Sequence, residues 1–208
     1  MQVNHLSPVN KGETVWTVDP TFVLFFGRLF NTGKVNLKRT IAIGGSAIST
    51  PEYVEALIGT PFADILKDAF KRQEGIRLIN GNPLTGIKSS LEDSVGVKTS
   101  EITAIPEGDH ADEMLGWILP RTNQLSTSHS YFSWLLGKKE YDLDARIKGG
   151  ERHIIMSGEY DKVLPMDIYS EFLIKAIIAG DIDRMEQLGI YEISPEDFAL
   201  AEFVDSSK

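Results

Sequence analysis

Cysteine is absent from all 208 residues of this chain. Its absence excludes disulfide bridges, zinc sites with thiolate ligands, iron–sulfur clusters held by cysteine, and thiol nucleophiles. Cysteine-free composition is compatible with a reducing compartment. We therefore expect no thiol-based chemistry and no covalent cross-links in this protein.

Long apolar runs are also missing. The longest, residues 22–26 and 174–179, are far shorter than the roughly 20 residues that a helix needs to cross a bilayer. Residues 1–8 contain neither a basic n-region nor an apolar core, so they do not resemble a signal peptide. The sequence therefore predicts a chain that is soluble by itself and is not secreted.

Dense clusters of basic residues are absent as well. The net charge is -9, from 21 Lys and Arg against 30 Asp and Glu, and no stretch could follow a phosphate backbone. We therefore expect no nucleic-acid partner.

Residues 1–109 hold 11 basic and 12 acidic side chains, whereas residues 110–208 hold 10 and 18. This change in charge indicates that two compositional units meet near residue 109.

The apolar content of 42% is enough for a buried core, and the length allows more than one domain. Asp19 followed by Pro20 is typical of a helix start, and Gly33 is placed to end that helix in a left-handed conformation. Residues 39–43 are predicted to form a strand that runs into a glycine turn. Residues 14–18 are predicted to form a short strand before this helix, so the chain begins with a strand and a helix and then enters a sheet.

The middle of the chain predicts a small mixed sheet crossed by one helix. Pro61 opens a predicted helix of about three turns. Further strands are expected at residues 53–58, 77–80, 84–87 and 101–105, separated by turn residues. The β-grasp is the commonest compact arrangement of such elements.

From residue 110 onward the pattern favours helices. A capping box at Ser194 and a helix start at Asp167 are the clearest signals. Helices are expected at residues 112–119, 130–136, 167–179 and 181–188 and after Ser194, with one strand at residues 152–156. The sequence therefore predicts an α+β fold with a mainly helical C-terminal domain.

Three patterns in the sequence are possible sites. The glycine turn at residues 44–46 could begin a phosphate loop, but the G-x-G-x-x-G spacing is absent and a tight turn explains it better. His110 lies among carboxylates at residues 109–113, yet a metal needs three or four convergent ligands, and helix capping is favoured. Serines beside His129 do not by themselves predict a catalytic pair. We therefore predict no catalytic residue and no metal site.

The richest aromatic cluster includes Tyr131, Phe132 and Trp134. Aromatic side chains on a short helix can belong to the core, anchor a protein partner or contact a ligand such as quinone. All three interpretations remain open, with the core favoured. These residues are nevertheless the candidates for a quinone contact or an interface.

Several segments together resemble the A subunit of the Na+-translocating NADH:quinone oxidoreductase. They are HLSPVNKGETVWTV, LINGNPLTGI, DEMLGWILP, KGGERHIIMSGEYDKVLPMDI and AGDIDRMEQLGIYEISPEDFALAEFV. The last two segments are long and idiosyncratic, so chance similarity is a poor explanation. The resemblance covers essentially the whole chain but only the later part of the family's longer sequence.

The resemblance implies a domain order, because this family is related to the C subunit of Rnf-type complexes and to the flavoprotein subunit of complex I. Residues 1–38 would be the tail of a Rossmann-like domain, 39–109 a β-grasp domain of the soluble-ligand-binding type, and 110–208 a mainly helical domain. Cluster-bearing relatives place a C-x-x-C-x-x-C run where this chain has residues 203–208 without a thiolate. The resemblance therefore implies no iron–sulfur cluster here, and neither flavin nor NADH can be carried over.

The function implied by the resemblance is that of a peripheral subunit on the cytoplasmic face of the bacterial inner membrane. Such a protein would dock on the other subunits, especially the membrane-embedded B subunit, and serve quinone handling without a tightly bound cofactor. NADH, flavins, iron–sulfur centres and quinone would act in or between other subunits. The alternatives are a stand-alone β-grasp ligand-binding module and a homologue of the Rnf-type C subunit.

Overall fold

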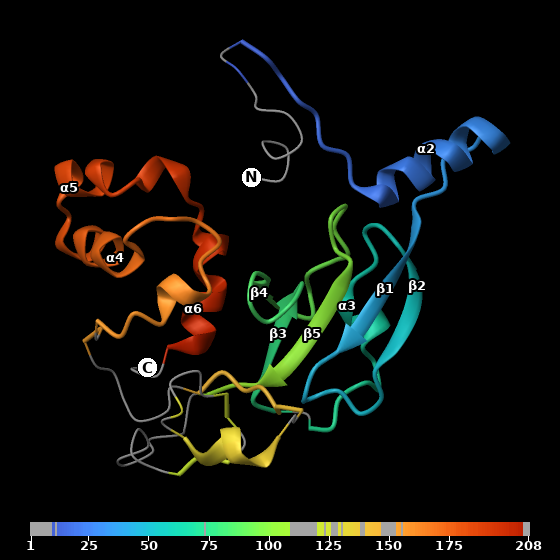
Figure 1. The fold of residues 1–208 in the computed structure, drawn as a ribbon. Coiled ribbons are helices and arrows are strands. Elements are labelled where there is room, and N and C mark those ends of the chain that lie inside the picture. The colour runs from blue at the N-terminus through green and yellow to red at the C-terminus, as the bar shows by residue number, and fades with distance from the viewer. Residues whose placement is uncertain are drawn as a thin grey trace.

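The structure is a computed structural model, and it combines a five-stranded sheet with a group of short helices beside it (Figure 1). It describes residues 10, 12–72, 74–108, 120–122, 124–125, 129, 131–137, 140–146, 153–154 and 156–205. Within these ranges, no helix has the length and apolar character needed to cross a membrane. The predicted α+β fold class is confirmed.

Helix α2 (Pro20–Thr32) precedes the sheet and has the predicted caps. The carboxylate of Asp19 accepts a hydrogen bond from the backbone N–H of Thr21 at 2.7 Å, and the helix ends at Gly33 with a φ of 67°. The guanidinium of Arg28 donates to the carbonyl of Lys38 at 2.5 Å, which ties the helix to the first strand. The sequence therefore predicted both ends of this helix. The predicted strand at residues 14–18 was wrong, since these residues form no strand and pair with no neighbour in the sheet.

The sheet has the strand order β2-β1-β5-β3-β4. Its strands are β1 (Lys38–Gly44), β2 (Glu52–Leu57), β3 (Ile76–Asn80), β4 (Ile87–Ser89) and β5 (Glu101–Pro106). The neighbours β1 and β5 are parallel, and all other neighbouring strands are antiparallel. This mixed sheet confirms the prediction of a mixed sheet in the middle of the chain.

Strand β4 begins where the predicted strand at residues 84–87 was expected to end, so that prediction was wrong in its bounds. The side chain of Asn82 accepts hydrogen bonds from the backbone N–H groups of Leu84 at 2.9 Å and Thr85 at 2.8 Å. These bonds form a turn in place of a strand, because an asparagine side chain can satisfy the backbone locally.

Helix α3 (Phe62–Ile65) packs Phe62 into the core of the sheet. The predicted helix of about three turns was wrong, since α3 contains four residues. Beyond it, the carbonyl of Ala69 accepts from the N–H of Ser49 at 2.7 Å, and the N–H of Lys71 donates to the carbonyl of Ala47 at 2.9 Å. Backbone pairing with a distant segment therefore replaces the continuation of the helix.

The glycine turn after β1 is confirmed as a tight structural turn. Gly45 has a φ of 115°, and a Cβ at this position would lie 2.1 Å from the carbonyl oxygen of Ala104. The hydroxyl of Ser46 donates to the carbonyl of Leu143 at 2.5 Å. The turn thus packs against β5 and is bonded to a later segment of the chain, as expected for a structural turn.

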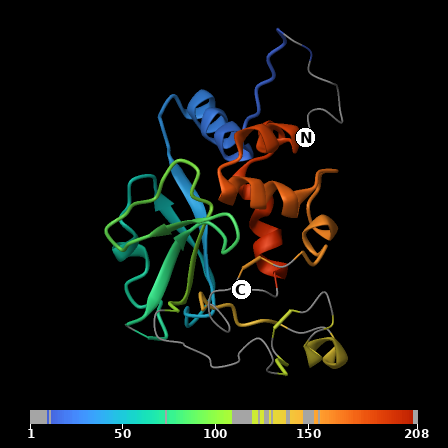
Figure 2. The same ribbon diagram turned by 90° about the vertical axis from the view of Figure 1, so that its left-hand side faces the viewer.

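The C-terminal part contains short helices, and those after residue 160 lie beside the sheet in both views (Figures 1 and 2). The helices are η1 (Phe132–Leu136), η2 (Tyr160–Lys162), α4 (Ser170–Ala179), α5 (Ile182–Gln187), η3 (Ile190–Glu192), η4 (Pro195–Phe198) and α6 (Ala199–Val204). The capping box at Ser194 and the helix end at Gly180 are confirmed.

Three other predictions for this part have different outcomes. Helix α4 begins at Ser170, so Asp167 is not its cap; the hydroxyl of Ser170 instead donates to Asp161 at 2.6 Å and fixes the helix start. Of the predicted strand at residues 152–156, the residues that the structure describes are not in a strand. The predicted helix at 112–119 lies outside the described residues.

Candidate functional site

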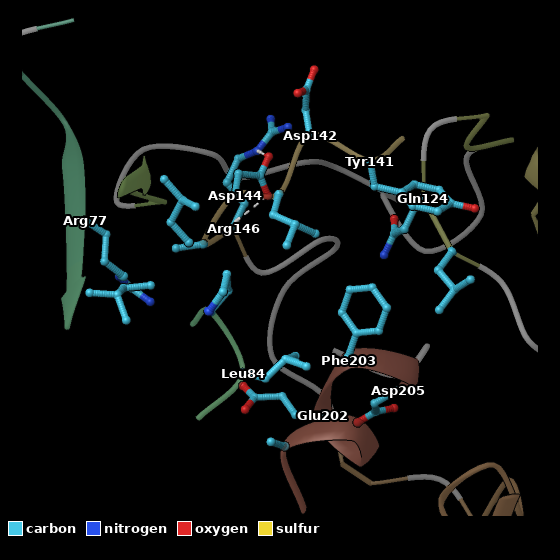
Figure 3. A pocket seen from close by; sticks show the side chains of 17 residues that line it. Arg77, Leu84, Gln124, Tyr141, Asp142, Asp144, Arg146, Glu202, Phe203 and Asp205 are labelled. Atoms are coloured by element: carbon cyan, nitrogen blue, oxygen red, sulfur yellow. Dashed lines mark hydrogen bonds and ion pairs between the residues drawn. The ribbon is translucent and has the colours of Figure 1, made fainter. Parts of the chain in front are cut away.

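A cavity of about 290 Å³ lies between the sheet and the C-terminal part (Figure 3). Its lining comes from β3 and β5, the turn before β4, residues 124–125, residues 141–146 and α6. These segments are far apart in the sequence. The cavity is therefore a product of the tertiary fold and has no single sequence motif.

The sheet wall of the cavity carries an ion-pair cluster around Glu107. The Nε atom of Arg77 donates to Glu107 Oε2 at 3.1 Å, a second guanidinium nitrogen contacts Oε1, and the Nζ atom of Lys88 lies 3.0 Å from Oε2. The hydrogen bond from Arg77 and, less strongly, that from Lys88 lower the pKa of Glu107 to about 2, although burial opposes this shift. Arg77 is thereby held at the edge of the cavity.

Replacing Glu107 by glutamine is expected to flatten the dependence of stability on pH in acid. The pKa of Glu107 is lowered from 4.5 to about 2, so the folded state binds fewer protons than the unfolded state between these values. The stabilisation is therefore present above about pH 4.5 and is lost as the pH falls towards 2. Since both cationic partners are partly exposed, screening limits the effect to about 1–2 kcal/mol.

The measurement is the urea midpoint at pH 7, 4.5 and 3 for the wild-type protein and for Glu107→Gln. Glu92→Gln, which removes an exposed carboxylate, is the matched control. An equal loss of stability with acid in Glu107→Gln and in the wild-type protein would contradict the assignment of this shift to the cluster.

The opposite wall is formed by residues 141–146, which are hydrogen-bonded to the end of strand β5. The N–H of Ala145 donates to the carbonyl of Pro106 at 3.1 Å, and a Cβ on Gly108 would lie 2.5 Å from the carbonyl oxygen of Ala145. The Nε atom of Arg146 lies 2.7 Å from the carboxylate of Asp144. Close backbone approach therefore sets the position of this wall.

Helix α6 closes the cavity from below in the view of Figure 3, where the ring of Phe203 points towards Tyr141 and Gln124. The helix end is held by the hydroxyl of Tyr160, which donates to Asp205 at 2.7 Å. Burial, and then the hydrogen bond to the Asp205 carboxylate, raise the pKa of Tyr160. Tyr160 is therefore a neutral hydrogen-bond donor that anchors this wall.

The chemistry of the cavity suits the binding of a small amphipathic molecule. Phe203 and Leu84 supply apolar surface, whereas the charged groups are the guanidinium groups of Arg77 and Arg146 and four carboxylates, those of Asp142, Asp144, Glu202 and Asp205. The buried Oε1 atom of Gln124 has no hydrogen-bond partner among the described residues, so it could accept a hydrogen bond from a bound molecule. The described residues contain no group of three side chains that could hold a metal ion.

The aromatic residues predicted from the sequence lie elsewhere, since the described lining of the cavity does not include them. Tyr131 is buried, whereas Phe132 and Trp134 in η1 are 56% and 49% exposed. The ring of Trp134 stacks on His129 with the centroids 5.0 Å apart. Their role as a quinone contact or an interface stays a prediction.

The other sequence candidates give less information. Residues 109–113, with His110, lie outside the described residues. Of the serines near His129, at positions 126, 128 and 130, none is described, so the proposed pairing is untested. Sequence analysis missed the cavity; the one local signal was the segment LINGNPLTGI, which supplies part of β3 and the adjoining turn.

Comparison with known proteins finds similarity to one subunit of a respiratory complex over nearly the whole chain. A family model described as "NqrA second alpha/beta domain" matches residues 1–35, and one described as "NQRA C-terminal domain" matches residues 40–90. The A subunit of the Na(+)-translocating NADH-quinone reductase from Neisseria meningitidis serogroup C is 32% identical over 207 residues, which cover 99% of this chain and 46% of that protein. Nearly the whole chain is thus similar to this A subunit, and two of its segments match domains of that subunit.

A subunits from other organisms show the same extent of similarity. The proteins from Rhodopirellula baltica and Alcanivorax borkumensis are 31% and 33% identical, over 99% of this chain and 45% and 46% of their own lengths. The chain thus spans about half the length of these curated relatives. One wall of the cavity, with Arg77 and Leu84, lies in the segment that matches the C-terminal domain.

Proposed function

We propose that this chain is part of a peripheral subunit of a Na+-translocating NADH:quinone reductase, in which it serves docking and quinone handling. The observation that carries the proposal is the similarity to the A subunit over 99% of the chain. In this role the chain rests on other subunits, above all the membrane-embedded B subunit, on the cytoplasmic face of the inner membrane. The redox cofactors, which are NADH, flavins and iron–sulfur centres, act in other subunits.

The domain assignment is part of the same proposal. The sheet order with parallel neighbours β1 and β5 supports a β-grasp domain at residues 39–109. The match of residues 1–35 to an α/β domain supports a Rossmann-like tail at residues 1–38. The prevalence of short helices after residue 130 supports a mainly helical third domain at residues 110–208.

The surface of η1 favours docking as one task of the C-terminal part. Phe132, Trp134, Leu135 and Leu136 are each about half exposed within a single short helix. Aromatic and aliphatic side chains of this kind are common anchors in protein interfaces. This helix is therefore the proposed contact with another subunit.

The cavity favours a second candidate function, that of a ligand-binding module. The ring of Phe203 offers an apolar surface, and the guanidinium groups of Arg77 and Arg146 lie at the edge of the cavity. These groups fit a flat molecule with polar substituents, which is the chemical class of quinones. In this alternative the chain binds quinone without being attached to a membrane complex.

One experiment separates the two candidates. The tagged chain is expressed with the remaining reductase subunits, and detergent extracts are purified on the tag. We expect the membrane subunits to co-elute, and co-elution to fall at least tenfold in Phe132→Glu/Trp134→Glu, whereas the control Tyr53→Glu on the exposed face of β2 has no effect.

The second arm titrates a short-chain quinone against the tryptophan fluorescence of the purified chain. Quinone binding without co-elution would favour the ligand-binding module. Absence of both would contradict the proposed function.

A further inference from the structure

Helix α2 has apolar side chains on two opposite sides, while Arg28, Asn31 and Thr32 lie on the remaining part of its circumference. Phe25 is buried on the side of the helix that faces the rest of the chain. On the other side, Val23, Phe26 and Phe30 recur at helical spacing and are 60%, 54% and 84% exposed. We call these three residues the α2 outer face. An apolar stripe of a helix normally packs against another element, so a second apolar side opposite Phe25 calls for a second packing partner.

Apolar residues that flank α2 in the sequence are exposed as well. Trp16 before the helix is 87% exposed and Val35 after it is 70% exposed. Figure 1 shows α2 at the end of the sheet, away from helices α4 and α5. Exposed apolar side chains gathered on one face of a helix mark an interaction site.

We propose that the α2 outer face docks into the remaining part of an α/β domain, of the kind that the relatives carry in the half of their sequence that this chain does not match. Residues 1–35 match the family's second α/β domain, and α2 is the helix within that segment. The relatives are about twice as long as the matched region. The choice of this domain as the binding partner rests on the proposed function of the chain as part of an A subunit.

The charge of α2 argues against a membrane surface as the occupant. Helices that lie on membranes carry Lys and Arg on a polar face opposite their apolar face. Arg28 is the one charged residue of α2, and its guanidinium donates to the carbonyl of Lys38. The helix therefore lacks the cationic face that a lipid headgroup layer would attract.

The test is co-expression of the full chain with the unmatched part of the A subunit from Neisseria meningitidis as a separate tagged polypeptide. The expected result is a one-to-one complex, with affinity reduced at least 100-fold by Phe26→Glu/Phe30→Glu. The control Ile178→Glu/Ile182→Glu changes two side chains that are 72% and 67% exposed elsewhere and leaves the complex intact. Membrane subunits are absent, so this result is independent of the test of the proposed function.

Three results would overturn the proposal. One is a soluble partner polypeptide that does not bind the chain. Another is a concentration-dependent dimer of the chain, or binding to anionic phosphatidylglycerol vesicles, that Phe26→Glu/Phe30→Glu abolishes. A third uses the chain alone: if this double variant lowers the thermal midpoint as much as a core substitution does, the α2 outer face is already covered.

Discussion

Replacing Gly45 by alanine is expected to destabilise the protein by about 3 kcal/mol or more. The φ of 115° is strained for any residue with a Cβ, and the added methyl group would lie 2.1 Å from the carbonyl oxygen of Ala104. That oxygen also accepts the hydrogen bond from the N–H of Ala47 at 3.0 Å. The substitution must therefore move backbone in both β5 and the turn.

Gly44→Ala is the matched control, because a Cβ on Gly44 meets no atom within 4 Å. We expect this neighbour to change the free energy of unfolding by less than about 1 kcal/mol. Urea unfolding followed by circular dichroism measures both variants. Equal effects at the two positions would show that contact with β5 does not set the requirement for glycine.

Replacing Phe62 by alanine is expected to cost about 3–5 kcal/mol, through lost burial and the cavity left behind. Phe62 is fully buried and packs in one cluster with Ile41 and Ile102 from the neighbouring strands β1 and β5. The cluster joins the one-turn helix α3 to the sheet. Loss of the ring therefore weakens the whole sheet and not α3 alone.

Phe30→Ala is the control for Phe62→Ala, because it removes the same ring from a side chain that is 84% exposed. Its expected effect on the chain alone is within about 0.5 kcal/mol. Thermal and urea unfolding of the two variants provide the comparison. A large loss in Phe30→Ala would contradict the exposure of the α2 outer face.

Gly45→Ala and Phe62→Ala are also expected to affect the candidate site, because both disturb the sheet that forms one wall of the cavity. Arg77 and Ile105, on neighbouring strands, line the cavity. Residues 141–146 are bonded to Ser46 and Pro106, which follow β1 and end β5. Variants that disturb the β1–β5 pair therefore shift both walls of the cavity at once.

Local signals in the sequence determined the ends of several elements. Asp19 and Gly33 bound α2 because a carboxylate can accept from the first turn and glycine can take a positive φ. The capping box at Ser194 acts within four residues in the same way. These interactions depend on neighbours in the chain, so the sequence alone predicts them. The absence of cysteine likewise excluded thiolate chemistry without any coordinates.

Only the tertiary structure decided where long-range contacts override these local signals. Helix α3 stops after one turn because residues 69–71 pair with residues 47–49, and the cavity forms because α6 and residues 141–146 approach β3 and β5. Tyr131 is buried while Phe132 beside it is exposed, a difference that an aromatic cluster in the sequence does not reveal. Such contacts join residues far apart in the chain, and their energies depend on packing that no local pattern records.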